Sequence, residues 1–188
     1  MAKKFPQLDD GLMSFIERQP IFFTASSAGD SRVNVSPRST SNFRVIDQHN
    51  VFYLDLSGSG NETAAHARAG GQATIMFCAF DGPPRILRLY GRFETVHRHS
   101  RDHRALIEQF FDGEVPLGTR QIMKLKFDLV IASCGFGVPL FDFVGERDSM
   151  ENCLTSLGRE AIENGWREKN VISLDGLPTG LFDGLVEK

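Results

Sequence analysis

The chain of 188 residues is 41% hydrophobic and 24% charged, which is the usual composition of a soluble globular protein. Its formal net charge of −3 excludes a general attraction to nucleic acid or anionic membranes, so neither partner is expected. Any anion site must therefore be local. The apolar runs are short and interrupted by charge, which argues against a transmembrane helix.

The cysteines and the N-terminal segment indicate a cytoplasmic protein. Cys78, Cys134 and Cys153 form no Cys-x-x-Cys pair and are odd in number, so we expect reduced thiols rather than a disulfide framework. The N-terminal segment contains lysine and then aspartate without an apolar core, unlike a secretory signal.

The first third of the chain predicts one short helix followed by strands. Residues 12–18 favour a helix ahead of Pro20, and residues 21–25 favour a buried strand that ends in a turn. Residues 32–36 alternate between polar and apolar side chains, as in a strand. Residues 43–46 and 51–56 are separated by a turn and predict a hairpin.

The middle of the chain combines one helix with strands of period two. Residues 62–68 predict a helix that ends at Gly70-Gly71, and residues 73–80 predict an apolar strand. Two later strands show a one-sided apolar pattern, in Leu87, Leu89, Gly91 and Phe93 and then in Met123, Leu125, Phe127, Leu129 and Ile131. One-sided strands of this kind are typical of antiparallel sheets.

Two further helices complete the prediction. Ser100 is placed to cap a helix that runs through Phe111. A later helix is expected over residues 150–164, with Gly165 as its stop and a stripe of Met150, Cys153, Leu154, Leu157 and Ala161. Short strands, tight turns and peripheral helices indicate a mainly β fold, a β-barrel with helical additions.

Two turns have the composition of an anion site. Residues 34–38, Asn-Val-Ser-Pro-Arg, offer a hydroxyl and a guanidinium, and residues 57–63, Ser-Gly-Ser-Gly-Asn-Glu-Thr, offer backbone N–H groups before a helix. A dinucleotide fingerprint is rejected because Thr63 replaces the third glycine and no βαβ pattern surrounds it. A P-loop is rejected because no Gly-Lys-Ser/Thr follows. For the second turn alone, an ordinary turn and helix cap remains the favoured interpretation.

The sequence around both turns resembles the FMN-binding split-barrel proteins related to pyridoxamine 5′-phosphate oxidase. The similarity is found in residues 34–37, 52–63, 76–80 and 82–92. It implies one domain over residues 1–188 that forms an antiparallel split β-barrel, with its core at about 20–135 and an extension at about 140–188. It also implies FMN as the cofactor and a homodimer with flavin sites at the interface. With this resemblance, anion binding at the two turns becomes the favoured interpretation.

The resemblance also implies which residues bind the cofactor. The phosphate roles fall to Ser36 and Arg38 and then to Asn61, Glu62 and Thr63, while Arg85 and Arg88 are candidates for flavin contacts from the dimer mate or for a solvated strand face. The same turns and a later glycine-rich loop add the remaining candidates, Asn34, Ser57, Gly58 and Cys134. Loss of the Arg38 side chain is expected to weaken FMN binding while leaving the stability of the free protein nearly unchanged.

A cysteine and a group of three histidines are the other candidate reactive groups. Cys134 is a candidate redox nucleophile, but a small buried thiol is the favoured interpretation. His97, His99 and His103 suggest a metal, yet neighbouring arginines favour a solvated strand-to-helix junction, and no metal site is predicted.

The expected function is that of an FMN-dependent oxidoreductase acting on a small molecule. No catalytic residue is assigned. The C-terminal residues 177–188 lack the basic Arg-Leu-x-Pro type segment of pyridoxamine 5′-phosphate oxidase itself, so oxidation of that vitamin is not expected. The alternatives are a non-catalytic flavin-binding or sensing module and a split barrel that uses deazaflavin or haem.

Overall fold

The computed structural model describes residues 2–183. In chain order the elements are β1 (Lys3–Phe5), α1 (Asp10–Glu17), β2 (Ile21–Ser27), β3 (Asn34–Ser39), a 3₁₀ turn (Thr40–Asn42), β4 (Phe43–Val45), β5 (Asn50–Leu56), α2 (Glu62–Arg68), β6 (Gln72–Cys78), β7 (Ile86–His97), α3 (Arg101–Phe111), β8 (Thr119–Ser133) and α4 (Ser149–Lys169).

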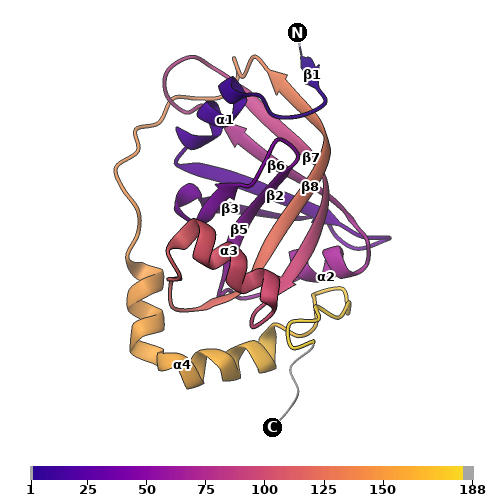
Figure 1. Cartoon of the computed structure of the whole chain (residues 1–188), viewed down its shortest axis with the longest axis vertical. Helices are drawn as coiled ribbons and strands as arrows, with labels where there is room; N and C mark the ends of the chain where they lie inside the picture. Colours follow the sequence, from indigo (N-terminus) through magenta and orange to yellow (C-terminus); the bar gives the residue numbers. More distant parts are fainter. Residues whose placement is uncertain (1, 184–188) are drawn as a thin grey trace.

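The strands form one curled antiparallel sheet with helices around it (Figure 1). The order is β3-β2-β6-β7-β8-β5-β4, and β1 adds to β8. Every pair in this order is antiparallel. The predicted mainly β class, the antiparallel sheet and the hairpin of β4 and β5 are confirmed.

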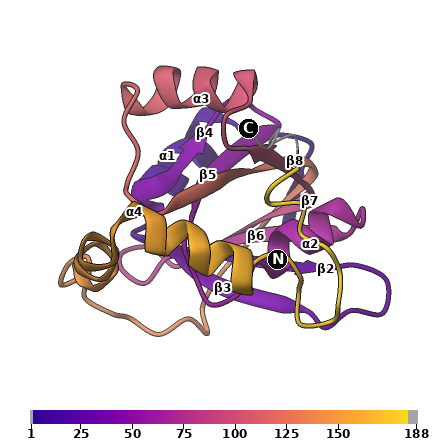
Figure 2. The same ribbon diagram turned by 90° about the horizontal axis from the view of Figure 1, so that it is seen from below.

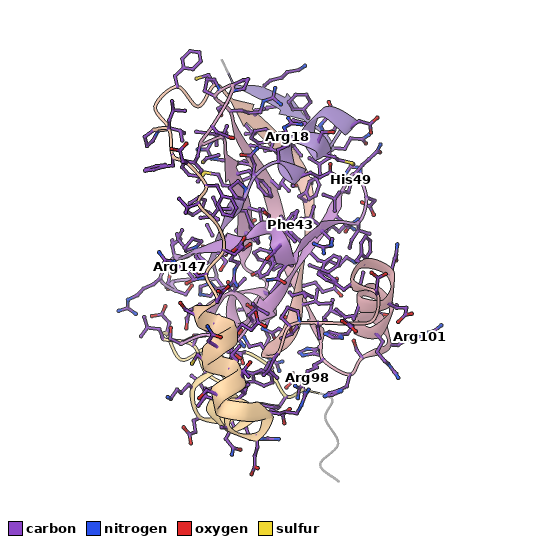
Figure 3. The ribbon with its side chains drawn as sticks, turned by 90° about the vertical axis from the view of Figure 1, so that its left-hand side faces the viewer. Arg18, Phe43, His49, Arg98, Arg101 and Arg147 are labelled. Carbon is purple, nitrogen blue, oxygen red and sulfur yellow. The ribbon has the colours of Figure 1, made fainter. Side chains whose placement is uncertain are left out.

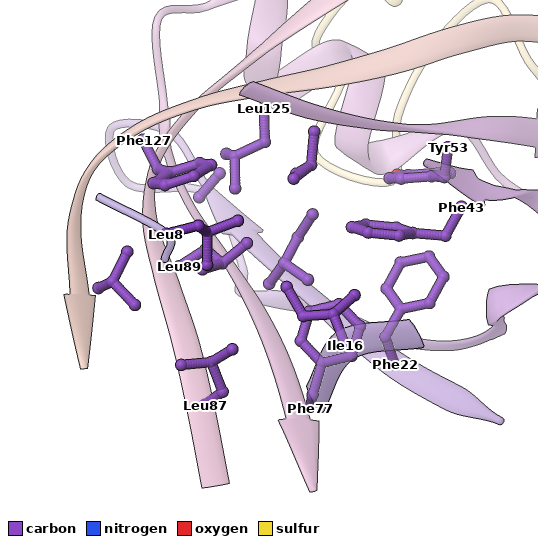
Figure 4. Packing of buried hydrophobic residues seen from close by; sticks show 14 of the residues in the cluster. Leu8, Ile16, Phe22, Phe43, Tyr53, Phe77, Leu87, Leu89, Leu125 and Phe127 are labelled. Atoms are coloured by element: carbon purple, nitrogen blue, oxygen red, sulfur yellow. The ribbon is translucent and has the colours of Figure 1, made fainter. Parts of the chain in front are cut away.

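Aromatic side chains fill the centre of the curled sheet. The Phe22 ring packs against Phe43 and Tyr53, with centroids 4.9 and 5.5 Å away, and against Phe77 at 5.9 Å (Figure 4). Aliphatic residues of β7 and β8, including Leu89 and Leu125, continue the same core. All of these side chains are buried, so the core fixes the strands that lead to the two predicted anion turns.

A β-bulge in β8 changes which residues face the core. Gly91 of β7 pairs with Phe127, whereas the preceding Tyr90 pairs with Leu129, so Asp128 is an extra residue. Beyond it Val130 is fully buried, and Leu129 and Ile131 are only partly buried. The predicted continuous core face from Met123 to Ile131 is therefore wrong after Phe127. Gly91 permits the close approach, because a Cβ there would collide with the Lys126 carbonyl oxygen.

The three shorter helices agree with the sequence prediction, but α4 does not. It runs to Lys169, past the predicted stop at Gly165, and its two halves point in different directions (Figure 1). The break lies at Gly158, which has φ 76° and ψ 162°, a conformation restricted to glycine. The buried residues are Leu154, Ile162 and Trp166, whereas Met150, Cys153 and Leu157 of the predicted stripe are exposed.

The C-terminal extension is attached to the barrel through Asn170. Its backbone oxygen accepts hydrogen bonds from Asn61 and Thr179, and its side chain bonds Arg120 and the Gly58 oxygen. Figure 2 shows the second half of α4 and the segment after it lying across this end of the barrel. The extension thus covers the turn that the sequence predicts as an anion site.

Residues 2–183 contain neither a candidate membrane span nor a candidate metal cluster. No helix there is both long and apolar enough to cross a membrane. No group of three or more histidine, cysteine, aspartate or glutamate side chains in that range is arranged to hold a metal ion.

Candidate cofactor-binding site

A cavity of about 1190 Å³ opens between β3, the end of β5, the turn before α2 and the first half of α4. Its inner part is formed by barrel residues such as Phe22, Tyr53 and Leu54. Its outer part is formed by residues 146–155 of the extension. One protomer therefore supplies both sides of the cavity.

The cavity brings together the residues predicted from the two anion turns. These are Asn34, Ser36, Arg38, Ser57, Gly58, Asn61, Glu62 and Thr63. The two turns are far apart in sequence, but β3 and β5 carry them to the same opening. Arg85, Arg88 and Cys134 are not among its lining residues in the described chain.

Arg38 lies at the floor of this cavity and is partly buried. Its Nη1 is 3.2 Å from a carboxylate oxygen of Asp55, its Nε donates to the Thr24 hydroxyl, and its guanidinium stacks 4.5 Å from the Tyr53 ring centroid. Burial lowers the pKa of Arg38, but Tyr53 and Asp55 outweigh that effect and leave it raised. A guanidinium has five N–H donors, so donors remain for an anion in the cavity.

Asp55 is the centre of a buried polar network. Arg120 donates to it at 2.8 Å and Gln121 at 2.9 Å, in addition to the ion pair with Arg38. Burial alone would raise the pKa of Asp55, but the charges of Arg120 and Arg38 and the two hydrogen bonds hold it below its ordinary value. The carboxylate is therefore ionised and shared by two arginines, which leaves an excess of positive charge at the floor.

The hydroxyl of Tyr53 is buried without a hydrogen-bond partner of acceptable geometry among the described residues. Thr63 lies near enough to influence its pKa, and burial, the largest effect, raises that pKa to about 12. The hydroxyl therefore stays protonated at neutral pH and is free to donate. A buried unpaired hydroxyl costs stability, so a ligand that accepts from it would recover that loss.

The turn before α2 bonds mainly to the rest of the chain. The Asn61 side chain is paired with Gln121 and Asn170, and Ser57 accepts from the Trp166 indole N–H at 2.8 Å. The Glu62 carboxylate accepts from the Leu174 N–H. These residues line the cavity, but Thr63, Asn34 and Ser36 retain more freedom to bind a ligand, since they bond only weakly to one another, at 3.3–3.4 Å.

The mouth of the cavity is acidic. Glu146, Asp148 and Glu151 line it from the extension, and Glu146 accepts a hydrogen bond from Ser39 at 2.6 Å. Arg147 lies among them on the exposed segment before α4 (Figure 3). Positive charge is thus concentrated at the floor and negative charge at the opening.

The comparisons with known proteins agree with this architecture. The family model described as pyridoxamine 5′-phosphate oxidase matches residues 8–134, which is more than half of the chain. The chain belongs to the pyridoxamine 5′-phosphate oxidase family. It is 34% identical over 200 residues to the family protein ustO of Aspergillus flavus, covering 98% of this chain and 80% of that protein.

Solved structures of low sequence identity share the split-barrel fold of this chain. A candidate pyridoxamine 5′-phosphate oxidase from Lactobacillus delbrueckii gives a TM-score of 0.53 at 12% identity, covering 67% of this chain and 94% of that one. HupZ of Group A Streptococcus gives 0.52 at 13% identity, covering 65% and 91%. The predicted split barrel is therefore confirmed, as is the family resemblance.

Three residues predicted to bind the cofactor lie elsewhere. Arg88 reaches towards Ser133 at 3.5 Å, and Arg85 lies over the Phe15 ring at 5.3 Å. Cys134 is exposed, so the interpretation of a small buried thiol is wrong. Within one protomer these residues do not contribute to the cavity.

The histidine cluster also differs from its favoured interpretation. His103 is buried, and the Nδ1 atom of His97 is buried without a partner among the described residues. The junction is therefore only partly solvated, because α4 packs against it through an ion pair of Glu163 with Arg98.

Sequence reasoning missed three residues of the site, namely Tyr53, Asp55 and Arg120. One signal was available: Asp55 is a charged residue inside the apolar run Val51–Leu56. A carboxylate in a buried strand requires a charged partner. The sequence does not reveal that Arg38 and Arg120 are the charged partners of Asp55.

Proposed function

We propose that this protein binds FMN in the large cavity and acts as an oxidoreductase on a small molecule. The observation that supports this most strongly is the floor of the cavity, where a guanidinium with spare donors lies beside an unpaired buried hydroxyl. A phosphate accepts from both kinds of donor and bonds arginine with charge assistance. Membership of the pyridoxamine 5′-phosphate oxidase family supports the same proposal.

The residues present fit a flavin phosphate at the floor. Arg38 and Tyr53 would donate to it, with Ser36, Asn34 and Thr63 around them. Apolar lining residues that are only partly buried, Leu56 and Leu117, offer a surface for a flat ring system. The acidic mouth disfavours a phosphate there, which makes the floor the better position for a dianion.

The volume leaves room for a second molecule. A pocket for one drug-sized ligand is typically about 300–1,000 Å³. This cavity has about 1190 Å³, so a substrate would fit beside the flavin.

FMN, when bound, supplies reversible hydride transfer, and the protein supplies binding and orientation. Asp55 is ionised and paired with two arginines, so it is a poor proton donor. Tyr53 keeps its proton and serves as a hydrogen-bond donor. The role of Asp55 and Tyr53 is therefore to hold and orient the flavin, and no proton-transfer residue is assigned.

The residues that line the cavity argue against one of the alternative cofactors, haem. Haem iron requires an axial ligand such as histidine, cysteine, methionine or tyrosinate. No histidine or cysteine of residues 2–183 lines this cavity, Met150 is at its exposed mouth, and Tyr53 stays protonated. This favours a flavin over haem. A deazaflavin and a non-catalytic flavin module remain the alternatives to exclude by experiment.

The test is spectroscopic and then kinetic. Purified protein should show flavin absorbance, and apo protein titrated with FMN should quench flavin fluorescence at micromolar concentration. Mass identification of the released cofactor separates FMN from deazaflavin. NAD(P)H oxidation by the loaded protein would distinguish an oxidoreductase from a binding module. Absence of quenching would overturn the proposal.

We also propose a homodimer. A segment between β8 and α4 exposes large apolar side chains, namely Phe136, Leu140, Phe141, Phe143 and Val144. Exposed apolar groups in one run are typical of an interface, and a two-fold dimer covers the same patch on both copies. In such a dimer Arg85 and Arg88 are candidates to approach the flavin of the other protomer.

A further inference from the structure

A second, smaller cavity of about 110 Å³ lies between the start of α3, the loop before β8 and the second half of α4. Its lining includes Arg98, His103, Arg159, Ile162, Glu163 and Trp166. Pro116 and Leu117 also line the large cavity, so this loop forms a partition between the two. The smaller cavity has no part in the proposed flavin site.

His103 lines this cavity and carries a polar atom without a partner among the described residues. The residue is only 7% exposed, and its Nε2 is buried without a hydrogen-bond partner among residues 2–183. Burial, followed by the nearby His99 and Arg98, lowers the pKa of His103, so the ring is neutral at physiological pH. A neutral imidazole can hold its proton on Nε2 and donate it to an acceptor in the cavity.

The charged lining residues leave a net positive charge. Arg98 forms an ion pair with Glu163 at 2.8 Å, so the charges of these two residues balance. The Arg98 guanidinium also lies over the Trp166 ring, 4.9 Å from its centroid (Figure 3). Arg159 has no ion pair within the described chain. One arginine without an ion pair therefore lines a space whose lining also includes the apolar residues Val115, Leu117 and Ile162.

We propose that this cavity is a binding site for a small carboxylate monoanion of about the size of acetate. The planar fork of Arg159 matches a carboxylate, and the orphan Nε2 of His103 is the second donor. The apolar walls suit a short alkyl group. Water occupies about 30 Å³ per molecule, so the cavity holds roughly four non-hydrogen atoms. One unbalanced positive charge fits a monoanion better than phosphate.

The chain contains a built-in reporter for this site. Trp166 is the only tryptophan in the sequence, and it lines the cavity. Sodium acetate should therefore change its fluorescence in a saturable way, with half-saturation at or below about 10 mM. The isosteric neutral molecule acetamide should cause no saturable change. Ionic strength is held constant with sodium chloride.

Variants identify the residues that bind. Arg159→Gln, at an exposed position, should weaken the binding of acetate by roughly ten- to a hundredfold. His103→Phe should weaken it as well. Arg101→Gln removes a nearby exposed arginine that does not line the cavity and should leave the titration unchanged. Circular dichroism checks that each variant is folded.

Several results would overturn the proposal. These are an absent or non-saturating response to acetate, an equal response to acetamide, or equal losses in Arg159→Gln and Arg101→Gln. Tighter binding of inorganic phosphate than of acetate would also contradict it. Because the readout needs no flavin, these outcomes are independent of the proposed FMN chemistry.

Discussion

The Arg38 guanidinium and the Asp55 carboxylate lie 3.2 Å apart at the floor of the large cavity. Asp55 is 2% exposed and is also bonded by Arg120, whereas the side chain of Arg38 is 21% exposed and borders the cavity. Arg38 therefore has two roles, one in holding the barrel end together and one in presenting charge to a ligand. A substitution at Arg38 should affect both.

Arg38→Ala should weaken FMN much more than riboflavin, because riboflavin lacks the phosphate. A charge-assisted hydrogen bond is worth about 1.5–3 kcal/mol, or roughly a ten- to hundredfold change in affinity. Contrary to the expectation from sequence, the free protein should also lose about 1–3 kcal/mol, because Asp55 loses one of its partners. Fluorescence titration and thermal unfolding measure the two effects.

Arg38→Lys is the matched control. It keeps the positive charge beside Asp55 and should retain more stability than Arg38→Ala, while still losing part of the phosphate affinity. Equal losses of FMN and riboflavin affinity would show that Arg38 does not bind the phosphate.

Asp55→Asn should flatten the dependence of stability on pH in acid. The pKa of Asp55 is lowered in the folded protein, so its carboxylate contributes fully above the unfolded pKa of about 3.9. That contribution to stability is lost as the pH falls from the unfolded-state pKa through the lower pKa of Asp55 in the folded protein. The variant should be less stable at pH 7 and should lose less on acidification. Chemical unfolding between pH 7 and about pH 2 tests this, and an unchanged acid slope would contradict it.

Gly158→Ala should destabilise the protein by about 1–3 kcal/mol, because alanine does not tolerate φ 76° and ψ 162°. No atom lies within 4 Å of a Cβ added there, so the cost is backbone strain alone. Gly165→Ala is the control. It lies in the helical part of α4 with open space around it and should stabilise by about 0.5–1 kcal/mol. Thermal unfolding compares the pair, and stabilisation by both would mean that α4 is not broken at Gly158.

Asn170→Ala should loosen the C-terminal extension. The change removes the hydrogen bond to Arg120 at 2.7 Å and the one to the Gly58 oxygen, for an expected loss of about 1–3 kcal/mol. Limited proteolysis should then cut residues 149–183 faster than in the wild type. Asn164→Ala on the exposed face of α4 should leave the cutting rate unchanged, and a similar increase in both variants would contradict the role of Asn170.

The proposed homodimer should have about twice the 21.0 kDa mass of the chain in light scattering. Phe143→Ser, at a position 61% exposed, should weaken the dimer without unfolding the protomer. A particle of single-chain mass at working concentration, with FMN present, would reject the proposal.

The alternation of apolar residues predicted the strands well, because one face of each strand is buried. It failed at Asp128, where one extra residue in β8 shifts the pairing opposite Gly91. The pattern on either side of a bulge still alternates, so the shift is visible only once the partner strand is known.

Some of the residues predicted to bind the cofactor lie together in the large cavity, and their role in binding stays a prediction. Asn34 and Thr63 came from turn composition and family resemblance, and both line the cavity. The Asp55 carboxylate is bonded by Arg120, which lies 65 residues away in sequence. The pairing of β5 with β8 brings the two residues together. The break in α4 was missed, because a glycine inside a helical pattern does not by itself reveal its backbone angles.

The attachment of Asn170 has a consequence for the order in which the protein matures. Synthesis delivers the strands with Asp55 and Arg120 first, and the residues that close the outer wall of the large cavity follow much later. Until Asn170 leaves the ribosome, Arg120 lacks one partner and the Gly58 turn is uncovered. A chain that stops before residue 146 therefore lacks the outer wall, and the cavity is complete only when residues 146–170 are present.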